Sequence, residues 1–140
     1  MSGFLLDTNV FSEPQKRRRH HGVIAWLAAQ NASQLFVSTL TIGENRRGIE
    51  LLRTRDHQRA ERIGNWLATV EVEFGDRVIP FTSLDAHQWG QLTASGPTLP
   101  LLDAQLAAVA LARGLVVATR NVSDFQRCGV DVVNPFEFQG

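Results

Sequence analysis

Hydrophobic residues along the chain gather in short apolar runs that alternate with longer stretches of helical spacing. The short runs are rich in Leu, Val, Ile and Phe and are apolar throughout, which is typical of strands buried on both faces. The pattern predicts strands at 3–7, 35–38, 78–80, 116–119 and 132–134, and helices at 22–30, 42–52, 56–70, 83–92 and 103–113. This alternation predicts an α/β fold with a central, mainly parallel sheet covered by helices on both faces.

Length and composition indicate one domain. The chain has 140 residues, of which 44% are hydrophobic, enough for one buried core, so we expect residues 1–140 to form a single domain. We expect no membrane span, because no run approaches the roughly 20 apolar residues that a bilayer requires. No basic and apolar leader is visible at the start, and a cytoplasmic location is expected.

Local signals predict several element boundaries. Ser83 is a candidate N-cap for the helix that follows it, and Gly114 is a candidate stop for the helix that ends at Arg113. The segment 13–21 combines a proline with a run of charged residues and is the one candidate for a flexible region.

Four acidic residues lie where predicted strands end or predicted helices begin. Asp7 closes the first apolar run, Asp124 follows the run at 115–118, and Glu44 and Asp103 open helical patterns. Each alone could be a helix cap or a first-turn acid. Together they occupy positions that a right-handed parallel sheet brings to one edge, outside the carboxyl ends of its strands. The sequence therefore predicts one acidic site.

Carboxylates brought that close would repel one another unless a cation held them together. A hard divalent ion that prefers oxygen ligands is the natural occupant. Cys128 is the only cysteine, which leaves neither a disulfide framework nor a thiolate zinc site. Any metal chemistry would therefore depend on the carboxylates.

The charge of the chain is balanced but unevenly distributed. Net charge is zero, yet residues 16–62 carry ten basic and four acidic side chains. The basic run that includes Arg17, Arg18 and Arg19 follows the first acidic position closely. It could be a solvated loop, a contact for phosphate groups, or a docking site for an acidic partner segment, and the sequence leaves these readings open.

The short sequence motifs around the four acids resemble those of a known family. Residues 4–9, FLLDTN, resemble the opening strand and motif of PIN domains, the nuclease domain of VapC-type toxins. TIGE at 41–44, followed by RRGI at 46–49, resembles the second acidic motif of the FitB-like branch of those toxins. LDAQLAA at 102–108 resembles the third motif, and TRNVSDF at 119–125 the fourth. The resemblance spans nearly the whole chain in the order and spacing of the family.

The resemblance implies a three-layer α/β/α PIN-like fold and a Mg²⁺- or Mn²⁺-dependent endoribonuclease that acts as the toxin of a type II toxin–antitoxin pair. It implies a cognate antitoxin, an RNA substrate and a homodimer, with DNA contacted only through the antitoxin. Asn45 departs from the family, because many relatives have an apolar residue beside the second acid. That departure concerns local packing or partner contacts and leaves the acidic set complete.

The hypothesis assigns a role to each site residue. Metal ligands are expected to be Asp7, Asp103 and Asp124, with Glu44 as a further ligand or as the group that orients and deprotonates the attacking water. Hydrogen-bond donors that orient these carboxylates are expected to be Thr8, Asn9, Thr119 and Asn121. Candidate contacts to RNA or to a partner are Arg17, Arg18, Arg19 and Arg46.

Two other functions are compatible with parts of the pattern. An aspartyl-phosphate hydrolase also has an acid after its first strand, but it needs a second acid two residues later, where this chain has Asn9. A non-enzymatic alternative is a catalytically weak domain that binds RNA or serves in a repressor complex through its antitoxin. The four intact acids argue against it.

Overall fold

The computed structural model of the protein describes residues 3–140. Five parallel strands form the sheet: β1 (Phe4–Leu6), β2 (Leu35–Ser38), β3 (Val78–Ile79), β4 (Val116–Ala118) and β5 (Val132–Val133). The α-helices are α1 (Thr8–Phe11), α2 (His21–Ala29), α3 (Thr39–Arg53), α4 (His57–Phe74), α5 (Ser83–Ser95), α6 (Leu101–Arg113) and α7 (Val122–Gln126). Short 3-10 turns are η1 (Glu13–Gln15), η2 (Ala32–Gln34), η3 (Gly75–Arg77) and η4 (Pro135–Glu137).

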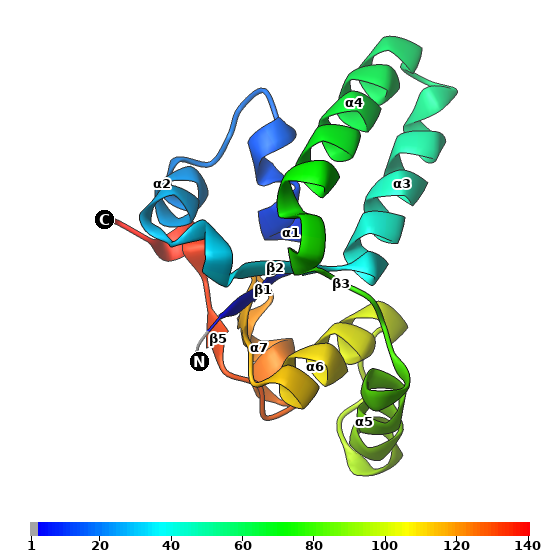
Figure 1. Ribbon diagram of the computed structural model, residues 1–140, viewed down its shortest axis with the longest axis vertical. Coiled ribbons are helices and arrows are strands. Elements are labelled where there is room, and N and C mark those ends of the chain that lie inside the picture. Colours follow the sequence, from blue (N-terminus) through cyan, green and yellow to red (C-terminus); the bar gives the residue numbers. More distant parts are fainter. Residues whose placement is uncertain (1–2) are drawn as a thin grey trace.

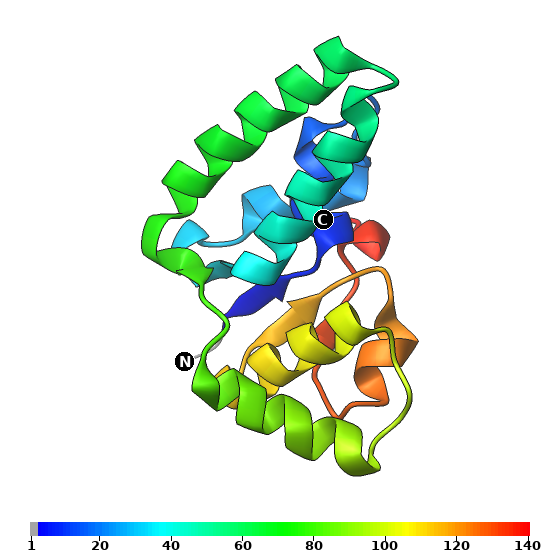
Figure 2. The ribbon, with the colours of Figure 1, turned by 90° about the vertical axis from the view of Figure 1, so that its right-hand side faces the viewer.

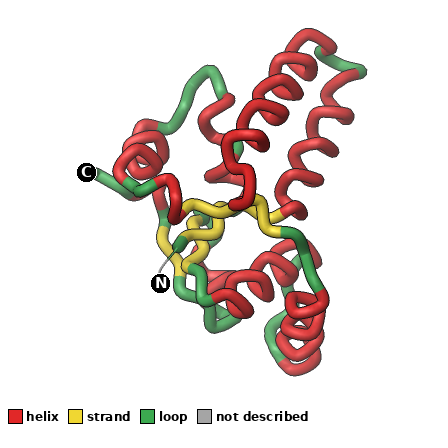
Figure 3. Tube along the Cα trace, viewed as in Figure 1, coloured by secondary structure: helices red, strands yellow, loops and turns green. Residues whose placement is uncertain are grey.

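Helices cover both faces of the sheet. Helices α1 to α4 lie on one side of the strands and α5 to α7 on the other (Figure 1). Figure 3 shows the strands as a thin central layer between these two groups of helices. The predicted three-layer α/β/α fold with a parallel sheet is therefore confirmed. Among residues 3–140, no helix combines the length and the apolar character needed to cross a membrane.

The two helical layers explain why the strands are apolar at nearly every position. Leu6 faces the core between the sheet and helices α1 to α4, whereas its neighbour Leu5 faces the core beneath α6. Val37 and Phe36 divide in the same way on β2. Side chains alternate between the faces of a strand, so a sheet buried on both faces needs apolar residues at consecutive positions.

The strand order places a topological switch point at the centre of the sheet. The order is β3-β2-β1-β4-β5, so the chain builds outward from β1 in one direction and returns to build from β4 in the other. Neighbouring loops leave a crevice at such a point, outside the carboxyl ends of the strands. Asp7 follows β1 and Thr119 follows β4, which puts both residues at this crevice.

Helices α3 and α4 form an antiparallel hairpin that projects beyond the sheet (Figure 2). The 18 residues of α4 are about 27 Å long at 1.5 Å per residue. This helix continues one turn past its predicted end at Val70, because Val70 and Phe74 extend the apolar stripe that includes Ile63 and Leu67. Asp56 caps its start by accepting the backbone N–H of Arg59 at 3.1 Å.

The predicted start of α3 and the predicted cap of α5 were wrong. Helix α3 begins directly after β2, because the Ser38 hydroxyl accepts the N–H of Leu40 at 3.0 Å. Glu44 therefore lies in the second turn of α3 and not in the first. The cap of α5 is Thr82 and not Ser83: the Asp85 carboxylate accepts the N–H of Thr82, completing a capping box.

The helix stop at Gly114 was predicted correctly, and two helices were missed. Gly114 ends α6 in the left-handed conformation, with φ of 64°, as predicted. The helices α1 and α7 were not predicted. They have four and five residues, too few to show helical periodicity.

The segment 13–21 has defined contacts at both ends. The carboxylate of Glu13 is buried and accepts the backbone N–H of His20 at 2.8 Å. The same carboxylate pairs with the ammonium group of Lys16 at 3.1 Å. His20 in turn caps α2, where its Nδ1 accepts the N–H of Val23. These contacts close residues 13–20 into a loop whose arginines are exposed.

Asp85 is expected to be a major determinant of stability. Its side chain is fully buried, caps α5 and forms an ion pair with Arg113 of α6. Replacing Asp85 with Ala would remove the cap and leave the partly buried guanidinium without its carboxylate. We expect the free energy of unfolding in urea to fall by about 3 kcal/mol. Asp131→Ala, at an exposed position, is the control and should change it by less than about 0.5 kcal/mol.

Candidate active site

Asp7 is held in place by donors from both sides of the switch point. Its side chain is buried, and one carboxylate oxygen accepts the N–H of Thr8 at 2.8 Å. The other oxygen accepts the hydroxyl of Thr119 at 2.8 Å and the amide of Asn9 at 3.3 Å. The carboxylate therefore joins the loop after β1 to the loop after β4.

Two further hydrogen bonds fix the loop after β4, one within that loop and one to the loop after β1. The hydroxyl of Thr119 also accepts the N–H of Asn121 at 2.8 Å, and Thr119 is fully buried. The N–H of Arg120 donates to the side-chain oxygen of Asn9 at 3.1 Å. These contacts orient the start of α7, which carries Asp124.

Asn121 brings two further carboxylates together. Its side-chain amide donates to Asp124 at 3.0 Å and lies 3.4 Å from an oxygen of Asp103. Asp103 is in the first turn of α6 and Asp124 in the first turn of α7, where each helix dipole favours a negative charge.

Glu44 reaches the cluster from α3. Its carboxylate accepts the hydroxyl of Thr8, the residue next to Asp7. Glu44 is exposed, in contrast to the buried Asp7. Each of the four expected donors thus contacts at least one of the acids, and residues from four different elements meet at one edge of the sheet.

The four carboxylates share one electrostatic environment. Partial burial raises the pKa of Asp103 to about 6, and the negative charges of Asp7, Asp124 and Glu44 add to the increase. Burial also raises the pKa of Asp7, against the opposing effect of its hydrogen bonds from Thr119 and Thr8. The site is therefore short of positive charge.

A divalent cation with oxygen ligands fits this donor set. The acids provide only carboxylate oxygens, which suit a hard ion, and repulsion from the other three acids adds to the effect of burial on the pKa of Asp103. Within residues 3–140, no three Asp, Glu, His or Cys side chains have the geometry of a formed metal centre. The acids that would hold the ion are Asp7, Asp103 and Asp124, with Glu44 at the rim.

The basic candidates belong to two different segments of the fold. Arg46 pairs with Glu50 along α3 at 3.1 Å, whereas Arg17 and Arg18 line a cleft beside α4, and Arg19 is exposed.

Two arginines beside the acidic site were missed from the sequence. Arg127 pairs with Asp124 at 3.1 Å, and the guanidinium of Arg120 lies 3.7 Å from the ring centre of Phe136. The available signal was their position: Arg120 is within the fourth acidic motif, and Arg127 is three residues after Asp124 on a helix.

Comparison with known proteins agrees with the fold. The PIN domain family matches residues 4–130. The chain is 36% identical to the VapC ribonuclease Y4jK of Sinorhizobium fredii, over 95% of this chain and 97% of that protein. The crystal structure of FitAcB from Neisseria gonorrhoeae superposes with a TM-score of 0.88 at 30% identity, covering 96% of this chain and 99% of the other.

A toxin–antitoxin complex from Klebsiella pneumoniae also contains a similar chain, with a TM-score of 0.69 at 25% identity and coverage of 97% of this chain and 100% of that one. This protein is a member of the PIN-domain family, in its VapC-like group. The family resemblance read from the four acidic motifs is confirmed.

Proposed function

We propose that this protein is a Mg²⁺- or Mn²⁺-dependent endoribonuclease and the toxin of a type II toxin–antitoxin pair. The observation that carries the proposal is the meeting of Asp7, Glu44, Asp103 and Asp124 at the switch point, with the pKa of Asp103 raised to about 6 by burial and by the other three charges. The similarity to a protein named a VapC ribonuclease supports RNA as the substrate. An RNA substrate would place the protein in the cytoplasm.

Asp7, Asp103 and Asp124 would hold the ion in this proposal. When bound, a divalent ion lowers the pKa of a water molecule and neutralises charge on the phosphate under attack. Thr119 and Asn9 orient Asp7 through their hydrogen bonds. Asn121 keeps Asp103 and Asp124 side by side, as residues behind metal ligands commonly do.

Glu44 would orient the water and accept its proton. Its carboxylate is exposed, so it can face the substrate, and the hydroxyl of Thr8 fixes its position relative to Asp7. The water oxygen would bond to phosphorus as the bond from phosphorus to the leaving ribose oxygen breaks, and the leaving oxygen would take a proton from solvent. The water proton would go to Glu44.

A cognate antitoxin would restrain the nuclease. The similar chain in the Klebsiella pneumoniae toxin–antitoxin complex supports such a partner. Homodimer formation, and contact with DNA only through the antitoxin, complete the proposal.

The decisive experiment is cleavage of total RNA by the protein freed of any partner. We expect cleavage in Mg²⁺ or Mn²⁺, complete loss with excess EDTA, and recovery when the ion is restored, because the acids need the cation to act on phosphate. Cleavage that persists in EDTA would refute the metal mechanism. Intact RNA in both ions would refute the nuclease function.

A further inference from the structure

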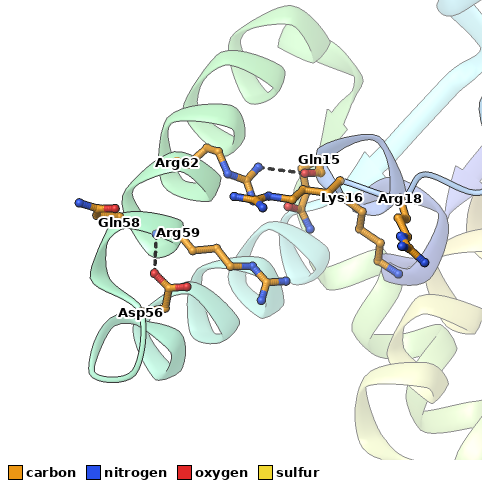
Figure 4. Close-up of a pocket in the computed structure, with 8 residues that line it drawn as sticks. Gln15, Lys16, Arg18, Asp56, Gln58, Arg59 and Arg62 are labelled. Atoms are coloured by element: carbon orange, nitrogen blue, oxygen red, sulfur yellow. Dashed lines mark hydrogen bonds between the residues drawn. The ribbon is translucent and has the colours of Figure 1, made fainter.

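A strongly basic cleft lies between the segment 15–18 and the start of α4 (Figure 4). Its volume is about 690 Å³. The cationic residues that line it are Lys16, Arg17, Arg18, Arg59 and Arg62, and the acid that lines it is Asp56. We refer to it as the basic cleft. Part of the excess positive charge of residues 16–62 is thus concentrated in one concave surface.

Contacts on both walls hold the basic cleft in shape. The guanidinium of Arg62 donates to the backbone carbonyl of Gln15 at 3.0 Å, joining α4 to the opposite wall. Buried Glu13 closes the loop behind that wall by binding Lys16 and the N–H of His20. Asp56 accepts the N–H of Arg59 as the cap of α4, so the acid is already engaged at the helix end. In Figure 4 the side chain of Arg59 extends across the cleft toward Lys16.

The chemistry of the lining suits a phosphate backbone better than a protein segment. Every residue that lines the basic cleft is charged or is a glutamine. Guanidinium groups bind phosphate oxygens through paired hydrogen bonds, and such contacts need no apolar surface. Protein partners are usually anchored by apolar side chains. A separate groove of about 270 Å³, lined by residues that include Phe11, Leu27, Trp66 and Phe74, has that apolar character instead.

The basic cleft is close enough to the acidic site for one RNA molecule to reach both. Only seven residues lie between Asp7 and Gln15, and most of them are in α1 and η1. At the rise of these helices, the eight steps from Asp7 to Gln15 span at most roughly 15 Å. A stacked strand that advances about 3.4 Å per nucleotide would cover that distance in about five nucleotides.

We propose that the basic cleft binds the phosphate backbone of the RNA substrate about five nucleotides from the bond that is cut. This inference rests on the proposed ribonuclease function and adds a second contact outside the acidic site. The cleft would hold long RNA on the enzyme without acting on the reacting phosphate. Its loss would therefore raise KM for long RNA and leave kcat unchanged, whereas an RNA too short to reach the cleft would be unaffected.

Binding can be measured independently of cleavage and of metal. The protein would carry Asp7→Asn and be titrated in EDTA against fluorescent single-stranded RNAs of 4 and about 20 nucleotides, between 50 and 200 mM KCl. With Arg18→Gln and Arg59→Gln added together, we expect binding of the long RNA to weaken on the order of tenfold. The slope of log Kd against log salt should fall by about 1.4, since each phosphate contact in a single strand contributes about 0.7.

Matched variants separate a local site from general charge. Arg55→Gln removes one charge from the same α3–α4 hairpin outside the lining and should leave the long-RNA affinity within about twofold. Arg59→Lys keeps the charge and should retain part of the affinity that Arg59→Gln loses. Thermal unfolding of each variant checks that the exposed substitutions preserve the fold.

Cleavage by the metal-loaded, partner-free protein gives the second readout. The Arg18→Gln/Arg59→Gln variant should show a KM about tenfold higher on the 20-nucleotide RNA, an unchanged kcat, and unchanged cleavage of the 4-nucleotide RNA. Unchanged long-RNA binding and KM would overturn the inference, and loss of partner binding in the same variant would then assign the cleft to a protein. If the unsubstituted protein binds long RNA through the cleft but cuts none, the proposed nuclease function fails and the cleft stands as an RNA-binding site.

Discussion

Replacement of Asp103 with Asn should lower the rate of RNA cleavage at least about a hundredfold. Stabilisation of charge by a metal ion is worth several kcal/mol, and each 1.4 kcal/mol corresponds to a factor of ten in rate. Asn keeps the size of Asp103 and its place in the first turn of α6 but removes the charge that would hold the ion. The measurement is single-turnover cleavage of a defined RNA at saturating Mg²⁺ or Mn²⁺.

The matched control is Asp131→Asn, an exposed carboxylate outside the cluster, which should retain the full rate. Asp7→Asn should behave like Asp103→Asn. Asn can also cap α1, so the fold should be kept while the buried negative charge is lost. If both Asp103→Asn and Asp7→Asn cut RNA at the rate of the unsubstituted protein, the assignment of these acids as metal ligands is wrong.

The second large effect concerns the stability of the metal-free protein as pH changes. Asp103 has a pKa of about 6 in the folded protein and an ordinary value of 3.8, so the folded state binds the proton more tightly. The stabilisation from protonating Asp103 is fully present below about pH 3.8 and is lost as the pH rises through about 6. In EDTA at pH 7.5, Asp103→Asn should therefore have a higher Tm than the unsubstituted protein, by about 3 °C after allowance for partial exposure. The two Tm values should converge near pH 4.

Addition of Mg²⁺ or Mn²⁺ should reverse that difference at pH 7.5. At ten times the dissociation constant, a ligand that binds only the folded state stabilises it by about 1.4 kcal/mol, or about 5 °C in Tm for a chain of this size. The ion should stabilise the unsubstituted protein and have little effect on Asp103→Asn, and at pH 5 protons should compete with it. Equal shifts in both proteins would show that the ion binds elsewhere.

Much of the fold could be predicted from local patterns. The uninterrupted apolar runs at β1, β2 and β4 indicated strands buried on both faces, and the structure places Leu5 and Leu6 in two different cores. Helix ends were harder to predict, because a cap depends on which side chain reaches a free N–H. The hydroxyl of Ser38 started α3 earlier than its apolar pattern suggested, and the carboxylate of Asp85 selected Thr82 over Ser83.

The candidate site also has features that the sequence predicts and features that it does not. The acids Asp7, Asp103 and Asp124 could be selected from the sequence, because each stands in a recognisable motif at a strand end or helix start. The pKa of Asp103 could not be predicted, because it depends first on how deeply the side chain is buried and then on its distances to three carboxylates from other elements. The basic cleft could be predicted only in part. Arg17 and Arg18 are adjacent in the chain, but Arg59 and Arg62 join them only when α4 packs beside residues 15–18.

The amino-acid sequence by itself determined three features of this protein. These are its apolar strands, its four acidic motifs and the excess of positive charge between residues 16 and 62. Such features depend on residue type and spacing, and both can be read from a single sequence. Tertiary structure decided which of these groups meet. Thr119 reaches Asp7 across 112 positions, and Arg62 reaches Gln15 across 47, because the parallel sheet and the helical hairpin bring distant segments within hydrogen-bond distance.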